Sequence, residues 1–104
     1  MAVPATAAWA ARLGMHMHER HLRHGNGASI TANKFDGIRA ALCTSVFMAE
    51  MSRRHNDANV LILGARVTEE SEAVAITRTW IDTPFEGGRH QRRLDKIAAI
   101  ECGG

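Results

Sequence analysis

Ala-Asn-Val-Leu-Ile-Leu-Gly-Ala-Arg-Val, residues 58–67, is the stretch of this chain that decides its fold class. Within it, Val60 to Leu63 form an unbroken apolar run. Such a run is typical of a parallel strand that helices cover on both faces, whereas a half-exposed strand alternates apolar and polar residues. We therefore expect a buried strand within residues 59–67, at the centre of an α/β domain.

The segments on either side of this strand show helix and strand patterns. We expect a short helix at 29–34, a strand at 38–43, a helix at 44–55, the central strand, a helix that begins after Thr68, and a last helix at 89–101. Thr44 and Thr68 are the expected N-caps of the two middle helices. Glu69 and Glu70 should lie in the first turn of the second one, where the helix dipole favours negative charge. This order of elements predicts an α/β fold.

Each longer helix has one face that we expect to be buried. These faces carry Val46, Phe47 and Met51 in the first helix, Ala73, Ile76, Thr77 and Trp80 in the second, and Leu94, Ile97 and Ala98 in the last. A parallel sheet of only two strands cannot cover so many apolar faces. Either the N-terminal segment completes the core, or a second copy of the chain packs against the first.

The composition is that of one small globular domain. The chain has 104 residues, 45% of them hydrophobic, and a formal net charge of +2, which selects neither a nucleic acid nor a membrane surface as partner. No stretch approaches the roughly 18 continuous apolar residues of a membrane helix. Cys43 and Cys102 lie in surroundings too different for a disulfide framework. We expect a cytoplasmic protein.

Residues 1–24 differ from the rest of the chain and form a weakly helical N-terminal segment. Four histidines, at positions 16, 18, 21 and 24, could cluster imidazoles for Zn or Ni. The segment lacks a set of carboxylate or cysteine partners, and a tract of this kind also binds metal adventitiously. We therefore expect no metal site and no cofactor, and we divide the chain into residues 1–24 and 25–104.

Candidate anion-binding groups occur at three places. Glycines precede a short helix at Gly25-Asn26-Gly27-Ala28-Ser29, where backbone N–H groups could converge on an anion, although a tight connection is the alternative. Arg89 and Arg93 are four residues apart on one helix face, which suits a phosphate but also describes a solvated cationic face. Arg66 follows the buried strand, at the edge where open α/β sheets bind ligands.

His55-Asn56-Asp57 concentrates polar groups between a helix and the buried strand. These side chains can donate, accept and exchange protons. The alternative is that they end the helix by capping it. The residues alone leave both interpretations open.

Five segments, taken in order, resemble consecutive motifs of the ribose-5-phosphate isomerase B and galactose-6-phosphate isomerase family of sugar-phosphate isomerases. They are the segments 25–34, 37–43, 55–60, 63–67 and 83–93. The resemblance covers about residues 25–101, and residues 1–24 match no part of the family's first half. It implies a truncated Rossmann-like α/β/α fold with a small parallel sheet and a C-terminal helix that packs on a partner subunit.

The resemblance also implies a role for each candidate residue. The reaction would be a cofactor-free aldose–ketose isomerisation of ribose 5-phosphate and ribulose 5-phosphate, in the pentose phosphate pathway, through an enediolate. The backbone of Gly25, Asn26, Gly27, Ala28 and Ser29 would stabilise the enediolate, His55 would open the sugar ring, and Asn56 would contact a hydroxyl. Arg66, Arg89 and Arg93 would hold the phosphate, the last two from the partner subunit of a homodimer or higher homo-oligomer.

The chain departs from the family at the proton-transferring base. The family places this base at the position of Leu22 or of Ala28, and neither side chain can abstract a proton from carbon. The family's Asp-His pair also has no counterpart here. The sequence therefore predicts an isomerase-like chain with impaired catalysis. The alternative is a non-catalytic module that binds a phosphosugar or dimerises.

Overall fold

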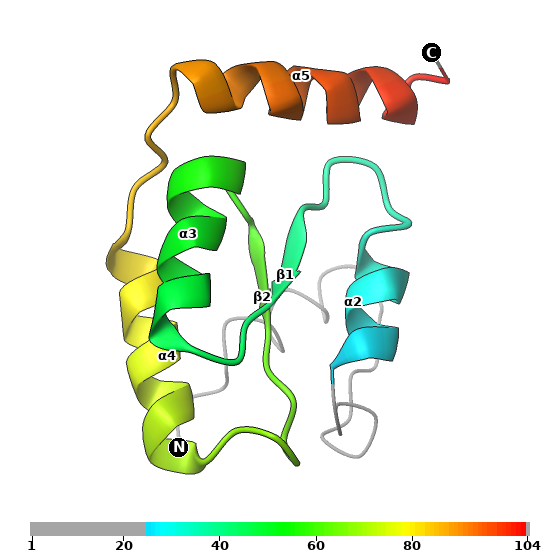
Figure 1. The fold of residues 1–104 in the computed structure, drawn as a ribbon. Coiled ribbons are helices and arrows are strands. Elements are labelled where there is room, and N and C mark those ends of the chain that lie inside the picture. The colour runs from blue at the N-terminus through cyan, green and yellow to red at the C-terminus, as the bar shows by residue number, and fades with distance from the viewer. Residues whose placement is uncertain (1–24, 104) are drawn as a thin grey trace.

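The computed structural model describes residues 25–103, which form one small α/β unit (Figure 1). The elements in chain order are α2 (Asn26–Ala32), β1 (Ala40–Leu42), α3 (Val46–Asn56), β2 (Val60–Ile62), α4 (Glu70–Asp82) and α5 (Arg89–Glu101). No helix of this part of the chain is long and apolar enough to cross a membrane. The expected weak helix and the histidine tract of residues 1–24 lie outside the described residues.

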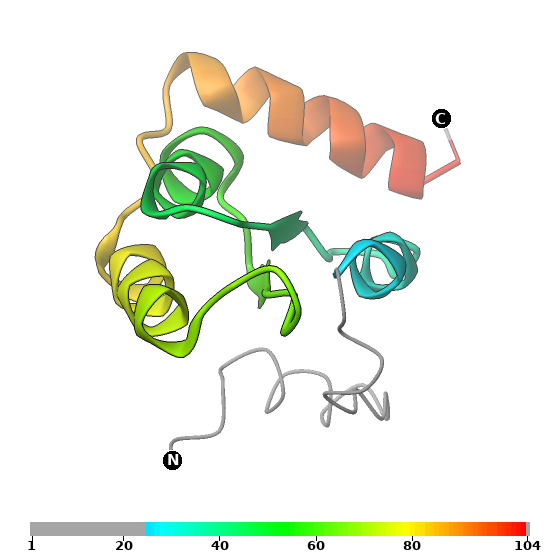
Figure 2. The ribbon, with the colours of Figure 1, turned by 60° about the horizontal axis from the view of Figure 1, so that its bottom comes forward.

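The two strands pair in parallel, with Ala41 opposite Leu61, and α3 is the crossover between them. Helix α2 covers one face of the sheet, and α3 and α4 cover the other (Figure 2). This arrangement confirms the expected small parallel sheet with helices on both of its faces. Both strands are shorter than expected, at three residues each. A strand extends only as far as a neighbouring strand forms backbone hydrogen bonds with it, and the hydrophobicity of the sequence does not specify where this pairing ends.

Two apolar clusters lie on the two faces of the sheet. Val60 and Ile62 pack with Ala32 of α2, whereas Leu61 packs with Ala49 of α3 and Ile76 of α4. All three residues of β2 are buried. The alternation of faces along β2 explains the apolar run in the sequence, because each face has its own helical cover.

Helix α3 buries a different face from the one expected. Phe47 is 67% exposed and Val46 is also exposed, while Ala49 is fully buried. Positions 47 and 49 differ by about 200° around a helix, so burying small Ala49 against the sheet turns Phe47 toward the outside. The N-cap is Ser45 rather than Thr44, because the Ser45 hydroxyl accepts a hydrogen bond from the Met48 amide at 3.2 Å.

The other expected helix starts also need correction. Helix α2 begins at Asn26 instead of Ser29, because Gly25 has a φ of 85° and the chain turns into the helix directly after it. Helix α4 begins at Glu70, and Thr68 does not cap it: its hydroxyl oxygen is buried without a partner among the described residues. The expected inner face of α4 is confirmed, with Ile76 fully buried.

Helix α5 has the expected bounds, but only part of its apolar face is open to the partner subunit that was expected to pack there. Leu94 is 8% exposed and is buried within its own chain, so it is not available to a partner. Ile97 is half-buried and Ala98 is exposed. The helix lies across the amino ends of the two strands (Figure 1), where the Glu101 carboxylate accepts a hydrogen bond from the Gly37 amide at 2.9 Å.

Candidate functional site

The predicted site residues fall into two groups, one at the carboxyl ends of the two strands (the carboxyl edge of the sheet) and one at their amino ends (the amino edge). Gly25 lies against Leu42 and Ile62, the last residues of the two strands, and therefore marks the carboxyl edge. Arg66 follows β2 at the same edge and is exposed. His55 precedes β2, so it lies at the amino edge together with α5. We call these groups the carboxyl half-site and the amino half-site.

The carboxyl half-site consists of the start of α2 and the turn after β2. Gly25 is buried, and its carbonyl accepts the first helical hydrogen bond from the Ser29 amide at 2.9 Å. The amides of Asn26, Gly27 and Ala28 precede the first helical bond and have no partner within the helix, as at the start of any helix. The geometry thus leaves backbone donors at the position that the sequence predicted.

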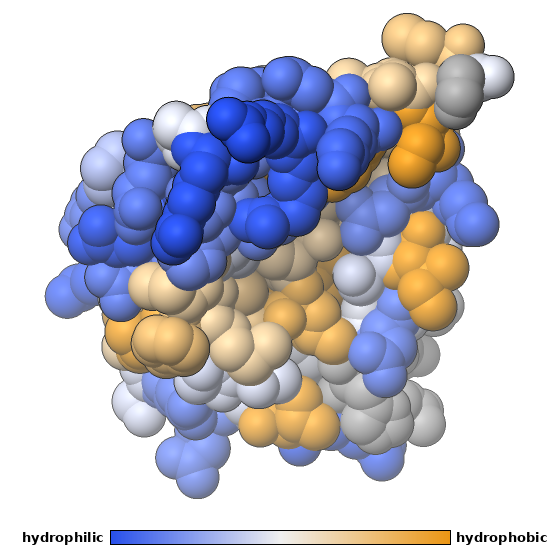
Figure 3. Space-filling model, turned by 45° about the horizontal axis from the view of Figure 1, so that its top comes forward, coloured by the Kyte–Doolittle hydropathy of each residue, from blue (hydrophilic) through white to orange (hydrophobic). Residues whose placement is uncertain are grey.

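The amino half-site is formed where the end of α3 meets the start of α5. The Arg93 Nη2 donates to the His55 carbonyl oxygen at 3.3 Å. The imidazole rings of His55 and His90 stack with their centroids 4.3 Å apart and their planes 18° apart. The first part of the outer surface of α5 is strongly hydrophilic, whereas its C-terminal end is hydrophobic (Figure 3). Arg89 and Arg93 are both exposed. Two predicted residues, His55 and Arg93, are therefore in direct contact.

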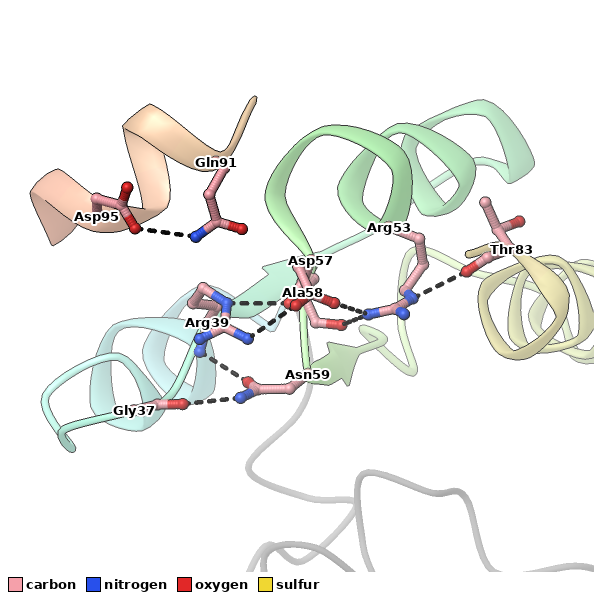
Figure 4. A network of polar contacts seen from close by, with 9 residues as sticks. All are labelled: Gly37, Arg39, Arg53, Asp57, Ala58, Asn59, Thr83, Gln91 and Asp95. Carbon is pink, nitrogen blue, oxygen red and sulfur yellow. Dashed lines mark hydrogen bonds and ion pairs between the residues drawn. The ribbon is translucent and has the colours of Figure 1, made fainter. Parts of the chain in front are cut away.

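Asp57 fixes the end of α3 that carries His55 and Asn56. It is the C-cap, with a φ of 44°, and its carboxylate pairs with Arg53 at 2.9 Å and with Arg39 at 3.4 Å. Figure 4 shows that these contacts join the start of β1, the end of α3 and the end of α4. The capping interpretation of this motif is thus correct for Asp57, while the ring of His55 turns toward α5.

His90 is the residue that the sequence interpretation missed. It is buried, and the Arg93 Nη2 lies 3.0 Å from its Nδ1, while the Glu86 carboxylate lies 3.7 Å from its Nε2. Burial lowers the pKa of His90, and the neighbouring His55 lowers it further. A histidine among arginines looks like part of a solvated face, so no local signal in the sequence distinguishes it from its neighbours.

A cleft of about 380 Å³ opens between α5 and the amino ends of the strands. Asn56 lines it with the apolar side chains of Ile38, Ile97 and Ile100. Asn56 is exposed at the rim of the amino half-site. Arg39 also lines the cleft, and its guanidinium forms an ion pair with the Asp57 carboxylate. The position of Asn56 is therefore open to a ligand that enters beside α5.

Within residues 25–103, His55, Glu86 and His90 are the residues whose donor atoms could meet a metal ion, since these atoms lie within 4.8 Å of one another. The present arrangement does not fit a metal. The lone pairs of two stacked rings lie in nearly parallel planes, so they do not converge on one ion. The donation by Arg93 also places the proton of a neutral His90 on Nε2, the nitrogen that faces Glu86.

The fold defines a small parallel α/β protein, with the start of a helix at the carboxyl ends of its strands and an arginine–histidine group at their amino ends. The family described as Ribose/Galactose Isomerase matches residues 22–97, and the chain belongs to this family. Ribose-5-phosphate isomerase B of Escherichia coli K12 is 51% identical over 77 residues, which are 74% of this chain and 52% of that protein.

Solved structures of the family have the same fold as the described unit. Ribose-5-phosphate isomerase B of Clostridium thermocellum is 53% identical, with a TM-score of 0.77 over 78% of this chain and 55% of that one. The Mycoplasma genitalium enzyme, solved with bound ribulose-5-phosphate, is 44% identical, with a TM-score of 0.75 over 77% of this chain and 53% of that one. The chain spans about half the length of the curated relatives it matches.

Proposed function

We propose that this chain is a ribose-5-phosphate isomerase B-like protein of the cytoplasm whose ligand is a phosphorylated pentose. The reaction of the complete site is the isomerisation of ribose 5-phosphate and ribulose 5-phosphate through an enediolate. The observation that carries the proposal is the gathering of the family motifs at the two sheet edges, with backbone donors at one and His55 in contact with Arg93 at the other.

Each half-site supplies a different part of this chemistry. Within the segment Gly25 to Ser29, the backbone N–H groups that precede the first helical hydrogen bond stabilise the oxyanion of the enediolate, because fixed donors need no reorganisation as the charge develops. His55 moves a proton during ring opening, and Asn56 binds a sugar hydroxyl. Arg66, Arg89 and Arg93 hold the phosphate, to which guanidinium groups bind with two parallel hydrogen bonds.

The separation of the half-sites favours a site shared between subunits. Arg66 lies at the carboxyl edge of the sheet, whereas Arg89 and Arg93 lie at the amino edge. One chain therefore does not bring its three arginines around one phosphate. A homodimer or higher homo-oligomer in which α5 of one copy meets the carboxyl edge of another would do so.

The chemistry of position 28 supports impaired catalysis. Ala28 is half-buried on the inner side of α2, where it packs toward Val60 and Ile62, and its methyl group cannot accept a proton. The phosphate and hydroxyl contacts do not depend on that residue. Binding of the sugar phosphate with slow or absent turnover is the expected behaviour, and a binding or dimerisation module is the second function that this residue favours.

Titration of the full chain with ribose 5-phosphate by calorimetry tests the proposal. Replacing both Arg89 and Arg93 by alanine should weaken binding at least tenfold, since hydrogen bonds to charged groups contribute about 1.5–3 kcal/mol each. Arg92→Ala, an exposed arginine on the same helix, is the matched control and should bind normally. No affinity in the unmodified chain, or equal affinity in the double variant, would contradict the phosphate site.

An activity assay then separates the two functions. The chain alone and the chain mixed with an intact family member are assayed for isomerisation, with mass measured in parallel. A catalytic chain converts ribose 5-phosphate by itself. A binding module does not, but it changes the mass or the activity of its full-length relative.

A further inference from the structure

We propose that His90 is a positioning residue that holds the His55 ring and the Arg93 guanidinium as one preassembled unit of the amino half-site. This inference rests on the proposed function, because it concerns two of its assigned residues. Neither the family motifs nor the sequence interpretation gave His90 a role. Its burial and its two ring contacts are the observations that do so.

The first contact is with His55. The two rings stack at 4.3 Å, so His90 covers one face of the His55 ring and restricts its rotation. His90 is itself only 6% exposed and belongs to the first turn of α5. The stack therefore ties a ring at the end of α3 to a ring that its own helix holds in place.

The second contact is with Arg93. The Nη2 of Arg93 lies 3.0 Å from the Nδ1 of His90 and 3.3 Å from the His55 carbonyl oxygen, so one nitrogen of the guanidinium has two acceptors. Arginine side chains lose much rotamer entropy when they are immobilised. An arginine that is already held in place loses less of it on binding phosphate, which strengthens binding.

Arg93 donates to His90 only while the imidazole is uncharged. A protonated ring carries N–H at both nitrogens and would direct one of them at the guanidinium. The charged and titratable groups around the ring are His55 from α3, Glu86 from the preceding loop, and Arg89 and Arg93 from α5. Glu86 is itself paired with Arg54 at 3.6 Å, which reduces its pull on a proton. These surroundings maintain the neutral ring.

Two substitutions separate the two contacts. His90→Phe keeps a ring that can stack on His55 but has no acceptor for Arg93. His90→Asn replaces the Nδ1 acceptor with an amide oxygen and removes the ring. We expect His90→Phe to weaken ribose 5-phosphate binding about tenfold, close to Arg93→Ala, and His90→Asn to stay within about threefold of the unmodified chain. Arg92→Ala is the control for general charge loss.

Nuclear magnetic resonance of the unmodified chain tests the geometry without a ligand. The ring protons of His55 should be shifted upfield by the His90 ring, and this shift should survive in His90→Phe and disappear in His90→Asn. The nitrogen signals of His90 should show the proton on Nε2. An unshifted His55, or a proton on Nδ1, overturns the inference even if the sugar phosphate binds. Equal affinity of His90→Phe and the unmodified chain overturns it as well.

The failure of the proposed function has a different signature. An unmodified chain that binds no sugar phosphate contradicts the proposed function, while the shift of His55 and the protonated nitrogen of His90 still decide whether the unit exists. A chain that binds normally but lacks both spectroscopic features retains the function and loses the positioning role. Circular dichroism of each variant confirms that it folds.

Discussion

Gly25 has a backbone φ of 85° and faces the side chains of Leu42 and Ile62. A Cβ at this position would overlap the Leu42 Cδ1 atom, and a residue with a side chain also disfavours the left-handed backbone. This residue joins the start of α2 to the ends of both strands. The carboxyl half-site therefore depends on the absence of a side chain at one position.

A pair of glycine substitutions measures this dependence. Gly25→Ala should lower the free energy of unfolding by about 2 kcal/mol or more, from backbone strain and overlap together. Gly27→Ala is the matched control: Gly27 lies inside α2, and a methyl group added there would meet no atom within 4 Å. This second substitution should therefore raise the free energy of unfolding by up to about 1 kcal/mol. Urea unfolding of the variants provides the values, and equal effects would contradict the account.

Individual side-chain contacts are the features that the sequence predicted least well. His55 and Arg93 were assigned from motifs, but their contact depends on how α5 crosses the end of α3. That crossing angle is a tertiary property. His90 was missed for the same reason, since only the packed structure shows that its ring is buried between His55 and Arg93.

At the scale of the elements, the starts of α2, α3 and α4 and the buried face of α3 were not predicted correctly. Thr44 and Ser45 are neighbouring residues that can both cap a helix, and the sequence does not decide between them. The bounds of α5 were predicted correctly because Gly87 and Gly88 separate it sharply from α4. The length of the strands was overestimated, since it depends on pairing partners more than on apolar character.

The N-cap of α3 can be identified by comparing alanine substitutions at Ser45 and Thr44. Ser45→Ala removes the acceptor for the Met48 amide and should cost about 1 kcal/mol of the free energy of unfolding. Thr44→Ala removes only a contact to the Met48 sulfur and should change stability by a few tenths of a kcal/mol. Thermal and urea unfolding of both variants decide between the two residues. A larger loss for Thr44→Ala would show that the sequence-based prediction was right.

For the whole molecule, the main consequence of the fold concerns assembly. The described residues contain a two-stranded sheet, and large apolar side chains remain outside the core, with Phe47 67% and Ile100 71% exposed. Burial of such side chains contributes about 1.5–3 kcal/mol each, which is substantial for a small domain. Association of copies should therefore stabilise the folded state.

We expect the melting temperature to rise with protein concentration, because association stabilises the folded chain by mass action. Calorimetry over a hundredfold range of concentration, with sedimentation to measure mass, tests this expectation. Ile100→Asp should shift the chain toward monomer, whereas Lys34→Asp, at an exposed polar position, should not. A folded monomer with a constant melting temperature would show that one chain completes its own core.

The two half-sites give each chain two unlike ends, and symmetry then decides how many sites an assembly can have. A two-fold axis that sets each amino edge against the partner's carboxyl edge closes after two copies and uses all four edges, giving two equivalent sites. A head-to-tail arrangement without closure would grow into a filament with one unused edge at each end.

In a closed pair, a chain with Arg66 replaced and a chain with Arg93 replaced form a hybrid with one intact site and one site that lacks both arginines. Equal mixing of two such inactive populations would then restore binding at about a quarter of all sites, a fraction that no arrangement with the whole site inside one chain can produce.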